Sequence, residues 1–525
     1  MGHGLAITIA GRRGGLTLIL LAGGLMLLCA LSLSGARAVP GSAATPPGPG
    51  GAGPAAVSAN HSPGRAHSRL ARAHPLVAGG ADSGQPLRQP AVYTSHRGVL
   101  NVTLVASQRR VTIGGRTVLA KVYNDSFTAP TLVVNRGDLV RVRLVNHLDE
   151  PTNLHFHGLE VPPSGHGDNI FVSVDPGRSF QYSFRLPRDA PTGTFWYHSH
   201  EMVPMDQMGR YPGAASEEQV FDGLSGLLEV QGLIGDLPHS LRAIPERYLA
   251  LRDVQIAGGQ IVSSNIDSAG ATTRLVDGQL TPKIAIAPGQ TELWHIGNVG
   301  ADIFYRLKLA GHSFDVIAQD GYQVVHAHRQ DTLVLPPGKR FDVLVRGTRR
   351  GVSPLRTAVY NEGDDRYPAR TLAEVVTGGR AQAPKAMPNV ISWATVDLRR
   401  DPLAGRRTVV FSEDEATNRF FIDGRTYDPS RIDLRARVGT VEQWTIVNHT
   451  DETHPFHIHT YQMQLISTNG VPDGFNGYQD EVVLPRRGYV VVRIRFARYT
   501  GITVFHCHIL AHEDAGMMAN IEVTR

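Results

Sequence analysis

An internal repeat constrains the fold of this chain more than any other feature of its sequence. Eight residues between positions 137 and 157 recur, without a gap, 302 positions later between positions 439 and 459. A second match, in which the pair beginning at His198 reappears as the pair beginning at His506, has an offset of 308. A chain of 525 residues with such copies is built from several similar domains.

A weaker third copy lies between these two and recurs 150 positions later in the last copy. Its matched members are Gly289, Glu292, Trp294 and Asn298, which correspond to Gly439, Glu442, Trp444 and Asn448. Each copy covers about 140 residues, in which apolar and polar residues alternate between turns of Gly, Pro and Asp. Alternation with a period of two is typical of strands in an antiparallel sandwich. The sequence therefore predicts an all-β chain of three sandwich domains, at residues 92–238, 239–392 and 393–525.

The N-terminus has the pattern of an export signal at residues 1–38. Arg12 and Arg13 precede an apolar run at residues 16–33, and Ala36-Arg37-Ala38 resembles a cleavage site. The adjacent arginines also fit a twin-arginine signal, whereas an uncleaved membrane anchor is the alternative. Residues 39–91 are rich in Ala, Gly, Pro and Ser and are expected to form a flexible leader. Both alternatives place the body of the protein outside the cytoplasm, in the periplasm or beyond the cell.

Composition excludes one class of partner and makes one cysteine informative. The net charge of +5 is small, and no long run of Lys or Arg supports nucleic-acid binding. We expect a monomer. One of the two cysteines, Cys29, lies in the signal, so the mature chain holds only Cys507 and no intrachain disulfide. A metal–thiolate bond would explain a single thiol in an exported protein.

Four His-x-His pairs fall in the outer two copies of the repeat: His155/His157, His198/His200, His457/His459 and His506/His508. Residues i and i+2 of a strand point to the same face, so each pair aims two imidazoles in one direction. The middle copy has Phe304, Leu307 and Leu309 where the third has His454, His457 and His459. The pairs are therefore expected to meet between the first and third domains, where eight neutral imidazoles suit copper.

A second kind of site is predicted at the C-terminus. Cys507 points to the opposite face from its neighbours His506 and His508. With His454, His512 and Met517 it offers two imidazoles, a thiolate and a thioether, the ligand set of a blue-copper centre. The first domain has Thr152, Ser199 and Leu227 at the positions of His454, Cys507 and Met517, so only the third domain is expected to carry this copper.

These motifs resemble those of the multicopper oxidases, in particular the three-domain laccases and the bacterial cuprous oxidases. The resemblance covers about residues 95–525 and rests on His155-Phe156-His157-Gly158, His198-Ser199-His200, His454-Pro455-Phe456-His457-Ile458-His459 and the run from His506 to Met517. It implies three cupredoxin-like Greek-key β-sandwich domains. It also implies an oxidase that couples one-electron oxidations of a reductant to the reduction of dioxygen to water.

The resemblance further implies four copper ions and a role for each ligand. Type 1 copper would be bound by His454, Cys507, His512 and Met517. Type 2 copper would be bound by His155 and His457. The type 3 pair would be bound by His157, His198, His200, His459, His506 and His508.

Two acids match positions that the family uses to deliver protons to reduced oxygen. Glu513 directly follows His512, and Asp168 follows the first motif. Because the reduction of dioxygen consumes protons, carboxylates that relay them make chemical sense. The alternative interpretation is a loop acid for Asp168 and a surface salt-bridge partner for Glu513.

Two other functions and several weaker features fit the sequence less well. A catalytically silent cupredoxin scaffold is disfavoured by the complete ligand set, and a copper nitrite reductase by the third domain. The reductant stays open between phenols or aromatic amines, a bilirubin-like pigment, and cuprous or ferrous ions. The pair His326/His328 is expected in a solvated loop, and His61, His67 and His74 in the leader are considered incidental.

An insert after His200 contains a methionine cluster. The offset between the outer copies falls from 308 to 290 at Gly226 and Gly516, which indicates 18 extra residues in the first domain. The insert opens with Met202, Met205 and Met208. Thioethers favour Cu(I), which hints at a cuprous-ion loop, although methionines at this spacing more often serve packing.

Overall fold

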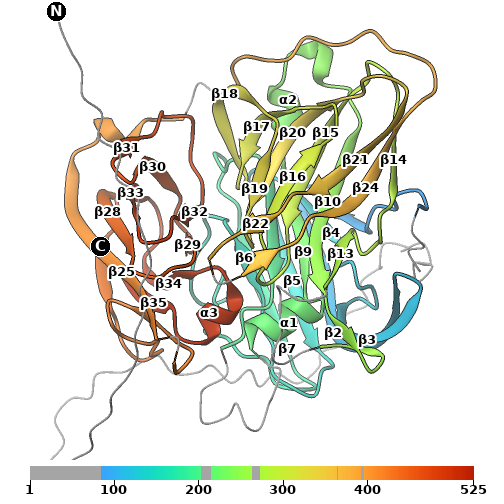
Figure 1. Cartoon of the computed structure of the whole chain (residues 1–525). Coiled ribbons are helices and arrows are strands. Elements are labelled where there is room, and N and C mark those ends of the chain that lie inside the picture. The colour runs from blue at the N-terminus through green and yellow to red at the C-terminus, as the bar shows by residue number, and fades with distance from the viewer. Residues whose placement is uncertain (1–83, 203–214, 263–271, 364, 392–394, 415) are drawn as a thin grey trace, which may run out of the picture. The chain divides into compact units, whose positions relative to one another are not determined.

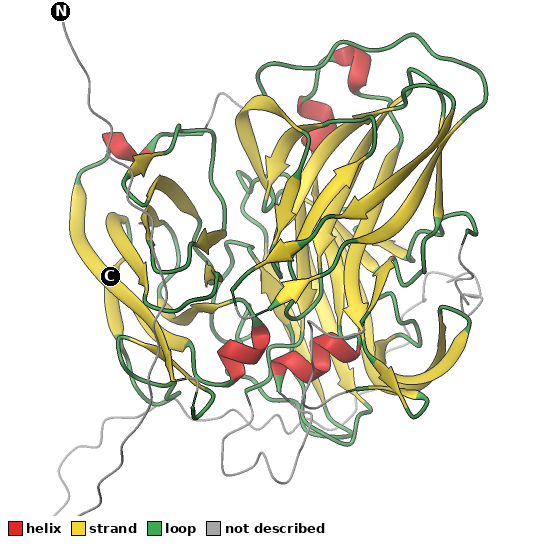
Figure 2. Cartoon of the chain, in the orientation of Figure 1, coloured by secondary structure: helices red, strands yellow, loops and turns green. Residues whose placement is uncertain are grey.

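The computed structural model describes residues 84–202, 215–262, 272–363, 365–391, 395–414 and 416–525. Within these residues strands predominate and helices are short, which confirms the predicted all-β class (Figure 2). Among the described helices, none has the length and apolar character needed to cross a membrane. The predicted export signal, and the leader as far as residue 83, lie outside the described residues.

The first sandwich, coloured blue to green in Figure 1, consists of two sheets. Its strands are β1 (Val92–Thr94), β2 (Val99–Ile113), β3 (Arg116–Tyr123), β4 (Thr131–Asn135), β5 (Leu139–Asn146), β6 (His155–His157), β7 (Ser179–Arg185), β8 (Gly193–His198), β9 (Ser225–Gln231), β11 (Ile256–Ala257) and β12 (Gln260–Ile261). One sheet has the order β1-β4-β9-β8-β6 and the other β11-β12-β3-β2-β5-β7. Strands β11 and β12 come from the middle segment of the chain, so that segment extends the first sandwich.

The second sandwich has the same division into a six-stranded and a five-stranded sheet. Its strands are β10 (Glu246–Val254), β13 (Thr273–Val276), β14 (Lys283–Ile286), β15 (Thr291–Asn298), β16 (Tyr305–Leu309), β17 (Phe314–Gln319), β18 (Tyr322–Gln330), β19 (Leu333–Leu335), β20 (Arg340–Arg346), β21 (Gly351–Thr357) and β24 (Arg370–Thr377), beside a small pair formed by β22 (Tyr360–Asn361) and β23 (Arg366–Tyr367). The sheet orders are β13-β10-β15-β20-β17-β18 and β14-β24-β21-β16-β19.

The third sandwich repeats this arrangement at the C-terminus. Its strands are β25 (Leu403–Asp414), β26 (Arg419–Ile422), β27 (Leu434–Arg437), β28 (Thr440–Asn448), β29 (His454–Ile458), β30 (Met463–Thr468), β31 (Val471–Pro472), β32 (Glu481–Leu484), β33 (Tyr489–Phe496), β34 (Gly501–Cys507) and β35 (Met518–Thr524). The orders are β26-β25-β28-β33-β30-β31 and β27-β35-β34-β29-β32. Strands β29 and β34 thus correspond to β6 and β8 of the first sandwich.

The described helices are few and short. They are α1 (Ser216–Asp222), α2 (Leu233–Asp236) and α3 (Leu510–Asp514), with 3-10 turns at η1 (His239–Leu241) and η2 (Leu398–Arg400). Helices α1 and α3 lie side by side, as Figure 1 shows. The carboxylate of Asp514 accepts hydrogen bonds from the backbone N–H groups of Ser216 at 3.3 Å and Glu217 at 2.8 Å. The first turn of α1, which has no cap of its own, is therefore capped from α3.

An asparagine ends a central strand in each sandwich and fixes the turn that follows it. Asn146, Asn298 and Asn448 each donate from Nδ2 to a backbone carbonyl four or five residues later, at 2.7, 2.8 and 2.7 Å. Such side-chain bonds replace the strand ladder with a turn. The turns lead into β6, β16 and β29. The same local chemistry thus places a histidine strand in each outer sandwich and a leucine strand in the middle one.

Residues 84–91 are not a free part of the leader, contrary to the expectation for residues 39–91. Leu87 N donates to Lys283 O at 2.8 Å, and Lys283 N donates to Gln85 O at 2.8 Å, so this segment pairs beside β14. The composition of the leader contained no hydrophobic period, but backbone groups can add to a sheet edge whatever side chains they carry.

Candidate metal centre

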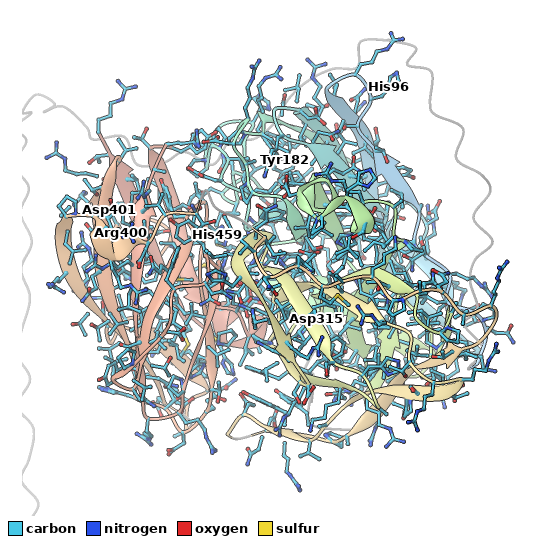
Figure 3. The ribbon with its side chains drawn as sticks, turned by 90° about the horizontal axis from the view of Figure 1, so that it is seen from above. His96, Tyr182, Asp315, Arg400, Asp401 and His459 are labelled. Atoms are coloured by element: carbon cyan, nitrogen blue, oxygen red, sulfur yellow. The ribbon has the colours of Figure 1, made fainter. Side chains whose placement is uncertain are left out.

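The eight histidines of the four His-x-His pairs lie at the ends of adjacent strands and are fully buried or nearly so. His155 of β6 pairs directly with His198 of β8, and His457 of β29 pairs with His506 of β34. In both sandwiches the remaining histidine of each pair follows two residues later on the same face. Figure 3 shows His459 between the C-terminal sheets and the rest of the described chain.

The two sandwiches interleave their imidazoles with pseudo-two-fold symmetry. His155 stacks on His459 with ring centroids 3.9 Å apart, and His157 stacks on His457 at 3.8 Å. The repeat relates His155 to His457 and His157 to His459, so these two stacks are equivalent. The structure therefore brings the predicted pairs together across the interface between the first and third sandwiches.

Three groups of these histidines have ring nitrogens that all lie within 4.8 Å of one another and could hold a metal ion. The groups are His157/His198/His508, His200/His459/His506 and His155/His157/His457. The first two divide the six predicted type 3 ligands into two sets of three. The third contains both predicted type 2 ligands. The sequence alone did not provide this division, because each set mixes residues from both sandwiches.

The nitrogen atoms themselves fit metal ions. Among the described residues, seven buried ring nitrogens have no hydrogen-bond partner: Nε2 of His155, His198 and His457, both nitrogens of His200, and Nδ1 of His459 and His508. Buried polar atoms without partners are costly in a folded protein. A set of them converging on one space is satisfied by bound metal, and imidazole nitrogen suits copper.

The opposite nitrogens of several rings are held by the backbone. His198 Nδ1 and His506 Nδ1 each lie 2.8 Å from the carbonyl oxygen of the following residue, and His457 Nδ1 lies 2.7 Å from Asp480 O. Since a carbonyl only accepts, these Nδ1 nitrogens carry the ring proton and leave the Nε2 nitrogens unprotonated. Burial also lowers the pKa of His198 to about 3 and the pKa of His200 to about 4. These two rings are therefore neutral at ordinary pH.

A second site lies on the other face of β34. Cys507 Sγ is 3.4 Å from His454 Nδ1 and 3.8 Å from His512 Nδ1, and these two nitrogens are 3.3 Å apart. Met517 is fully buried, and its backbone bonds to both His512 and Cys507. The four predicted type 1 ligands are thus gathered in one place. Cys507 joins this place to the histidine cluster because it stands between His506 and His508.

One histidine of this second site reaches the surface. His512 has 13% of its side chain exposed, whereas His454 has none. The ring of Phe420 stacks on His512 with centroids 4.1 Å apart and an angle of 15°. His512 is therefore the edge at which an electron donor in solution can approach.

The first sandwich contains a degenerate counterpart of the second site. Ser199 and Leu224 form the backbone bond that Cys507 and Met517 form in the third sandwich. Leu224, rather than the predicted Leu227, is therefore the counterpart of Met517. The paired strands β8/β9 and β34/β35 give an offset of 293, so the insert has 15 residues instead of 18. The sequence match at Gly226 and Gly516 was coincidental.

In the first sandwich, side chains that bond to one another occupy the position that corresponds to the second site. At the offset of 293, Gln219 of α1 corresponds to His512. Its Oε1 accepts from Thr152 Oγ1 at 2.7 Å and from Ser199 Oγ at 2.6 Å. These three residues satisfy one another, so the site offers no free ligand. The role of Gln219 could have been found from the sequence only with the correct offset.

The two predicted acids are buried beside the histidine cluster and are not surface groups. Asp168 Oδ1 accepts from Phe156 N at 2.8 Å and lies 3.0 Å from His155 Nδ1. Burial raises the pKa of Asp168 to about 8. Glu513 lies 2.8 Å from His506 Nδ1. Burial raises the pKa of Glu513, but the neighbouring imidazoles of His200 and His506 outweigh this and lower it.

Two residues beside the cluster were not predicted. Asp480 lies 3.2 Å from His157 Nε2, and Arg340 of the middle sandwich donates to Asp480. Asp480 is 323 positions from His157, and no motif marks either residue. Only the packing of the three sandwiches reveals them.

The remaining sequence features lie elsewhere. His326 and His328 belong to β18, not to a loop as expected, and Asn476 binds the backbone of His326 and Nδ1 of His328. Strand pairing with β17 explains the difference. Met202 packs beside Ile170 and Met518. Met205, Met208 and the three leader histidines lie outside the described residues.

Comparison with known proteins agrees with this geometry. Three family models, each described as multicopper oxidase, match residues 105–224, 239–352 and 401–525. A multicopper oxidase of Staphylococcus haemolyticus is 29% identical over 413 residues, which cover 77% of this chain and 83% of that protein. The multicopper oxidase MmcO of Mycobacterium tuberculosis is 25% identical, covering 85% and 92% of the two chains.

The solved structures give the same result. A multicopper oxidase from Campylobacter jejuni, described as a metallo-oxidase, superimposes with a TM-score of 0.74 and 25% identity, covering 85% of this chain and 96% of that chain. The resemblance drawn from the sequence motifs is confirmed, together with the cupredoxin-like domains and copper as the cofactor. The chain belongs to the multicopper oxidase family.

Proposed function

We propose that the residues gathered here hold four copper ions in the arrangement of the family. His454, Cys507, His512 and Met517 would hold type 1 copper, and His155 and His457 type 2 copper. One type 3 copper would be held by His157, His198 and His508, and the other by His200, His459 and His506. The single observation that carries this proposal is the position of Cys507, whose neighbours on both sides belong to the histidine cluster.

The protein oxidises a reductant one electron at a time and reduces dioxygen to water. Copper bound at these residues supplies the one-electron chemistry and the site at which dioxygen is reduced. His512 presents its exposed edge to the reductant. Because Cys507 Sγ faces His454 and His512 while the neighbouring side chains face the cluster, a few covalent bonds of β34 connect the two sites.

Residues around the cluster would supply protons to it and exclude bulk water from it. The reduction of one dioxygen to water consumes four protons, which have to reach a buried space. Asp168, whose raised pKa keeps its carboxyl protonated near neutral pH, would hold a proton 3.0 Å from His155 Nδ1. Glu513 would accept and pass protons at the opposite end, beside His200 and His506. The fully buried rings exclude bulk water from the space between them.

Neither alternative function is favoured. A catalytically silent scaffold would have no reason to keep seven buried imidazole nitrogens without a hydrogen-bond partner among the described residues. A two-domain copper nitrite reductase does not account for three family matches along the chain.

The location and assembly of the protein are also part of the proposal. The pattern of residues 1–38 supports export to the periplasm or the cell exterior, after which the protein would act as a monomer and without nucleic acid. The domain limits proposed near residues 92, 239 and 393 are supported by the spacing of the three family matches.

If the signal is cleaved, mass spectrometry of the purified protein will place its N-terminus after Ala38. An intact N-terminus would favour the membrane anchor.

Steady-state oxygen consumption with a phenol, Cu(I) and Fe(II), measured side by side, tests the oxidase and identifies its reductant class. We expect oxygen uptake that saturates with at least one of the three. Copper-free protein under the same conditions is the matched control and should consume none beyond the background autoxidation. Equal uptake by the copper-loaded and copper-free proteins with all three reductants would contradict the proposed function.

A further inference from the structure

Asp480 contacts two histidines of the cluster that come from different sandwiches. Its backbone carbonyl accepts from His457 Nδ1 at 2.7 Å, which leaves His457 Nε2 free. Its carboxylate oxygen Oδ1 lies 3.2 Å from His157 Nε2. Since a carboxylate accepts, this contact places the ring proton of His157 on Nε2 and turns Nδ1 toward His508, 3.2 Å away. One residue thus sets the protonated nitrogen and the ring orientation of both histidines.

Arg340 of β20 holds this carboxylate in place. Its Nη1 donates to Asp480 Oδ1 at 2.9 Å and its Nη2 donates to Oδ2 at 2.6 Å, in the two-pronged geometry that only arginine offers. Both side chains are buried, with 0% of Arg340 and 1% of Asp480 exposed. A buried carboxylate needs a compensating charge, and Arg340 provides it.

The remaining donors of Arg340 bond to the first sandwich and to its own, middle sandwich. Nε donates to Thr194 O of β8 at 3.1 Å, and Nη1 also donates to Gly338 O at 2.8 Å. Thr194 belongs to the first sandwich, Gly338 to the middle one and Asp480 to the third. Arg340 therefore connects all three sandwiches immediately beside the cluster.

The residue next to Arg340 supports the same segment. Lys339 Nζ donates to Gln479 Oε1 at 2.9 Å and to Glu481 O at 3.1 Å, so Asp480 is held on both of its sides. Lys339 itself pairs with Asp320 at 2.8 Å. Lys339 and Arg340, two consecutive cationic residues of the middle sandwich, thus both bond to residues 479–481 of the third sandwich.

Gly158 provides an independent sign of how tightly this pair packs against the cluster. It follows His157 directly and has φ = +84°, a left-handed conformation that favours glycine. A Cβ added to it would lie 2.0 Å from Asp480 Oδ2 and 2.7 Å from Arg340 Nη2. The glycine of the first His-x-His motif is therefore required by the Arg340–Asp480 pair.

We propose that Arg340 is a positioning residue for the copper cluster, through which the middle sandwich orients His157 and His457 by way of Asp480. This inference rests on the proposed assignment of those histidines as ligands. It gives the middle sandwich, which lost its own histidines, a part in building the site of its neighbours.

The test compares Arg340→Lys, which keeps the charge but loses the two-pronged contact, with Asp342→Asn as a matched control. Asp342 lies two residues further along β20, and its carboxylate accepts a hydrogen bond from the backbone nitrogen of Thr194 at 3.0 Å. It forms no hydrogen bond or ion pair with the eight histidines, all of which the structure describes. Each copper-free protein is titrated with Cu²⁺ against a competing chelator. The type 2 signal is followed by electron paramagnetic resonance and the type 1 site by its blue absorption.

For Arg340→Lys we expect type 2 copper to bind about 10- to 100-fold more weakly, the usual effect of losing a partner that orients a metal ligand. The blue absorption should be unchanged, because Arg340 touches none of the type 1 ligands. Asp342→Asn should bind type 2 copper as the wild type does, even if it unfolds at a lower temperature.

Three results would overturn the proposal. The first is wild-type affinity for type 2 copper in Arg340→Lys, and the second is an equal loss of that affinity in Asp342→Asn. The third is a loss of the blue absorption together with the type 2 signal in Arg340→Lys, because this would show that Arg340 supports the fold as a whole. A wild-type protein that shows no type 2 signal would instead contradict the proposed function, so the two failures are distinguishable.

Discussion

Burial shifts the pKa of several titratable residues in the two candidate copper sites. It lowers the pKa of His512 to about 3 and the pKa of His155 and His457 well below the usual range, so protons do not compete for these rings at neutral pH. The thiol of Cys507 behaves in the opposite way, because burial raises its pKa. Copper binding at the type 1 site must therefore displace a proton from Cys507, which ties its copper affinity to pH.

The acid Glu513 gives a direct test of proton delivery at the residue scale. Glu513→Gln keeps the size of the side chain but cannot accept and release a proton. We expect turnover to fall by about 10²-fold or more, with normal copper content and blue absorption. The measurement is oxygen consumption at saturating reductant, together with the copper content of the same sample.

Asp514→Asn is the matched control for this variant. Asp514 is the next residue in α3, but its carboxylate caps α1. It should consume oxygen at nearly the wild-type rate. If Glu513→Gln consumed oxygen as fast as this control, Glu513 would not be a proton relay.

Residue types and their alternation along strands were enough to predict which residues the structure gathers into the two candidate sites. A strand sends i and i+2 to one face, so His506 and His508 could be assigned to one site and Cys507 to the other. The Arg340–Asp480 pair could not be predicted, because it depends on contacts between sandwiches far apart in the chain. The division of the type 3 histidines into two sets also needed the interface.

At the scale of elements, the repeat predicted corresponding strands because matching residues form the same local hydrogen bonds. Trp294 and Trp444 each donate to the glutamate two residues earlier, at 3.0 and 2.9 Å. The prediction failed where the copies differ in length. The insert before β9 shifted the assumed offset by three, which gave Leu227 in place of Leu224, and strand β18 was mistaken for a loop.

A buried histidine between the first and middle sandwiches predicts how stability depends on pH. His295 of β15 lies 2.6 Å from Asp342 and 3.2 Å from Glu246. Burial alone would lower its pKa, but the hydrogen bonds to these two carboxylates raise it to about 10. The pKa is thus raised above its unfolded value of about 6.5, so the stabilisation is complete below that pH and is lost as pH rises through about 10.

The thermal unfolding of copper-free wild type and His295→Gln, followed from pH 6 to pH 10.5, tests this dependence. We expect the wild type to be more stable at pH 6 by at least about 1.4 kcal/mol, the equivalent of one pKa unit. The difference should shrink steadily above neutral pH. Two curves that remain parallel over this range would show that His295 is not charged in the folded protein.

At the scale of the whole molecule, three copies of one sandwich have taken on different tasks. The third keeps both kinds of site, the first keeps its histidine pairs and fills the second position with Gln219, and the middle one has buried Phe304, Leu307 and Leu309 instead. A cluster shared by the first and third sandwiches needs both of them in a fixed relation. The contacts of Arg340 and Lys339 indicate that the middle sandwich maintains it.

The copper content and blue absorption of wild type and Cys507→Ser, measured on the same copper-loaded preparations, test the central claim most directly. Cys507 is the only thiol outside the predicted signal, and the claim is that it binds copper in one site while its neighbours His506 and His508 bind copper in the other. The account predicts about four coppers and an intense blue band for the wild type, and about three coppers with no blue band for Cys507→Ser. A blue band that survives in Cys507→Ser, or a wild type that binds a single copper, would contradict it.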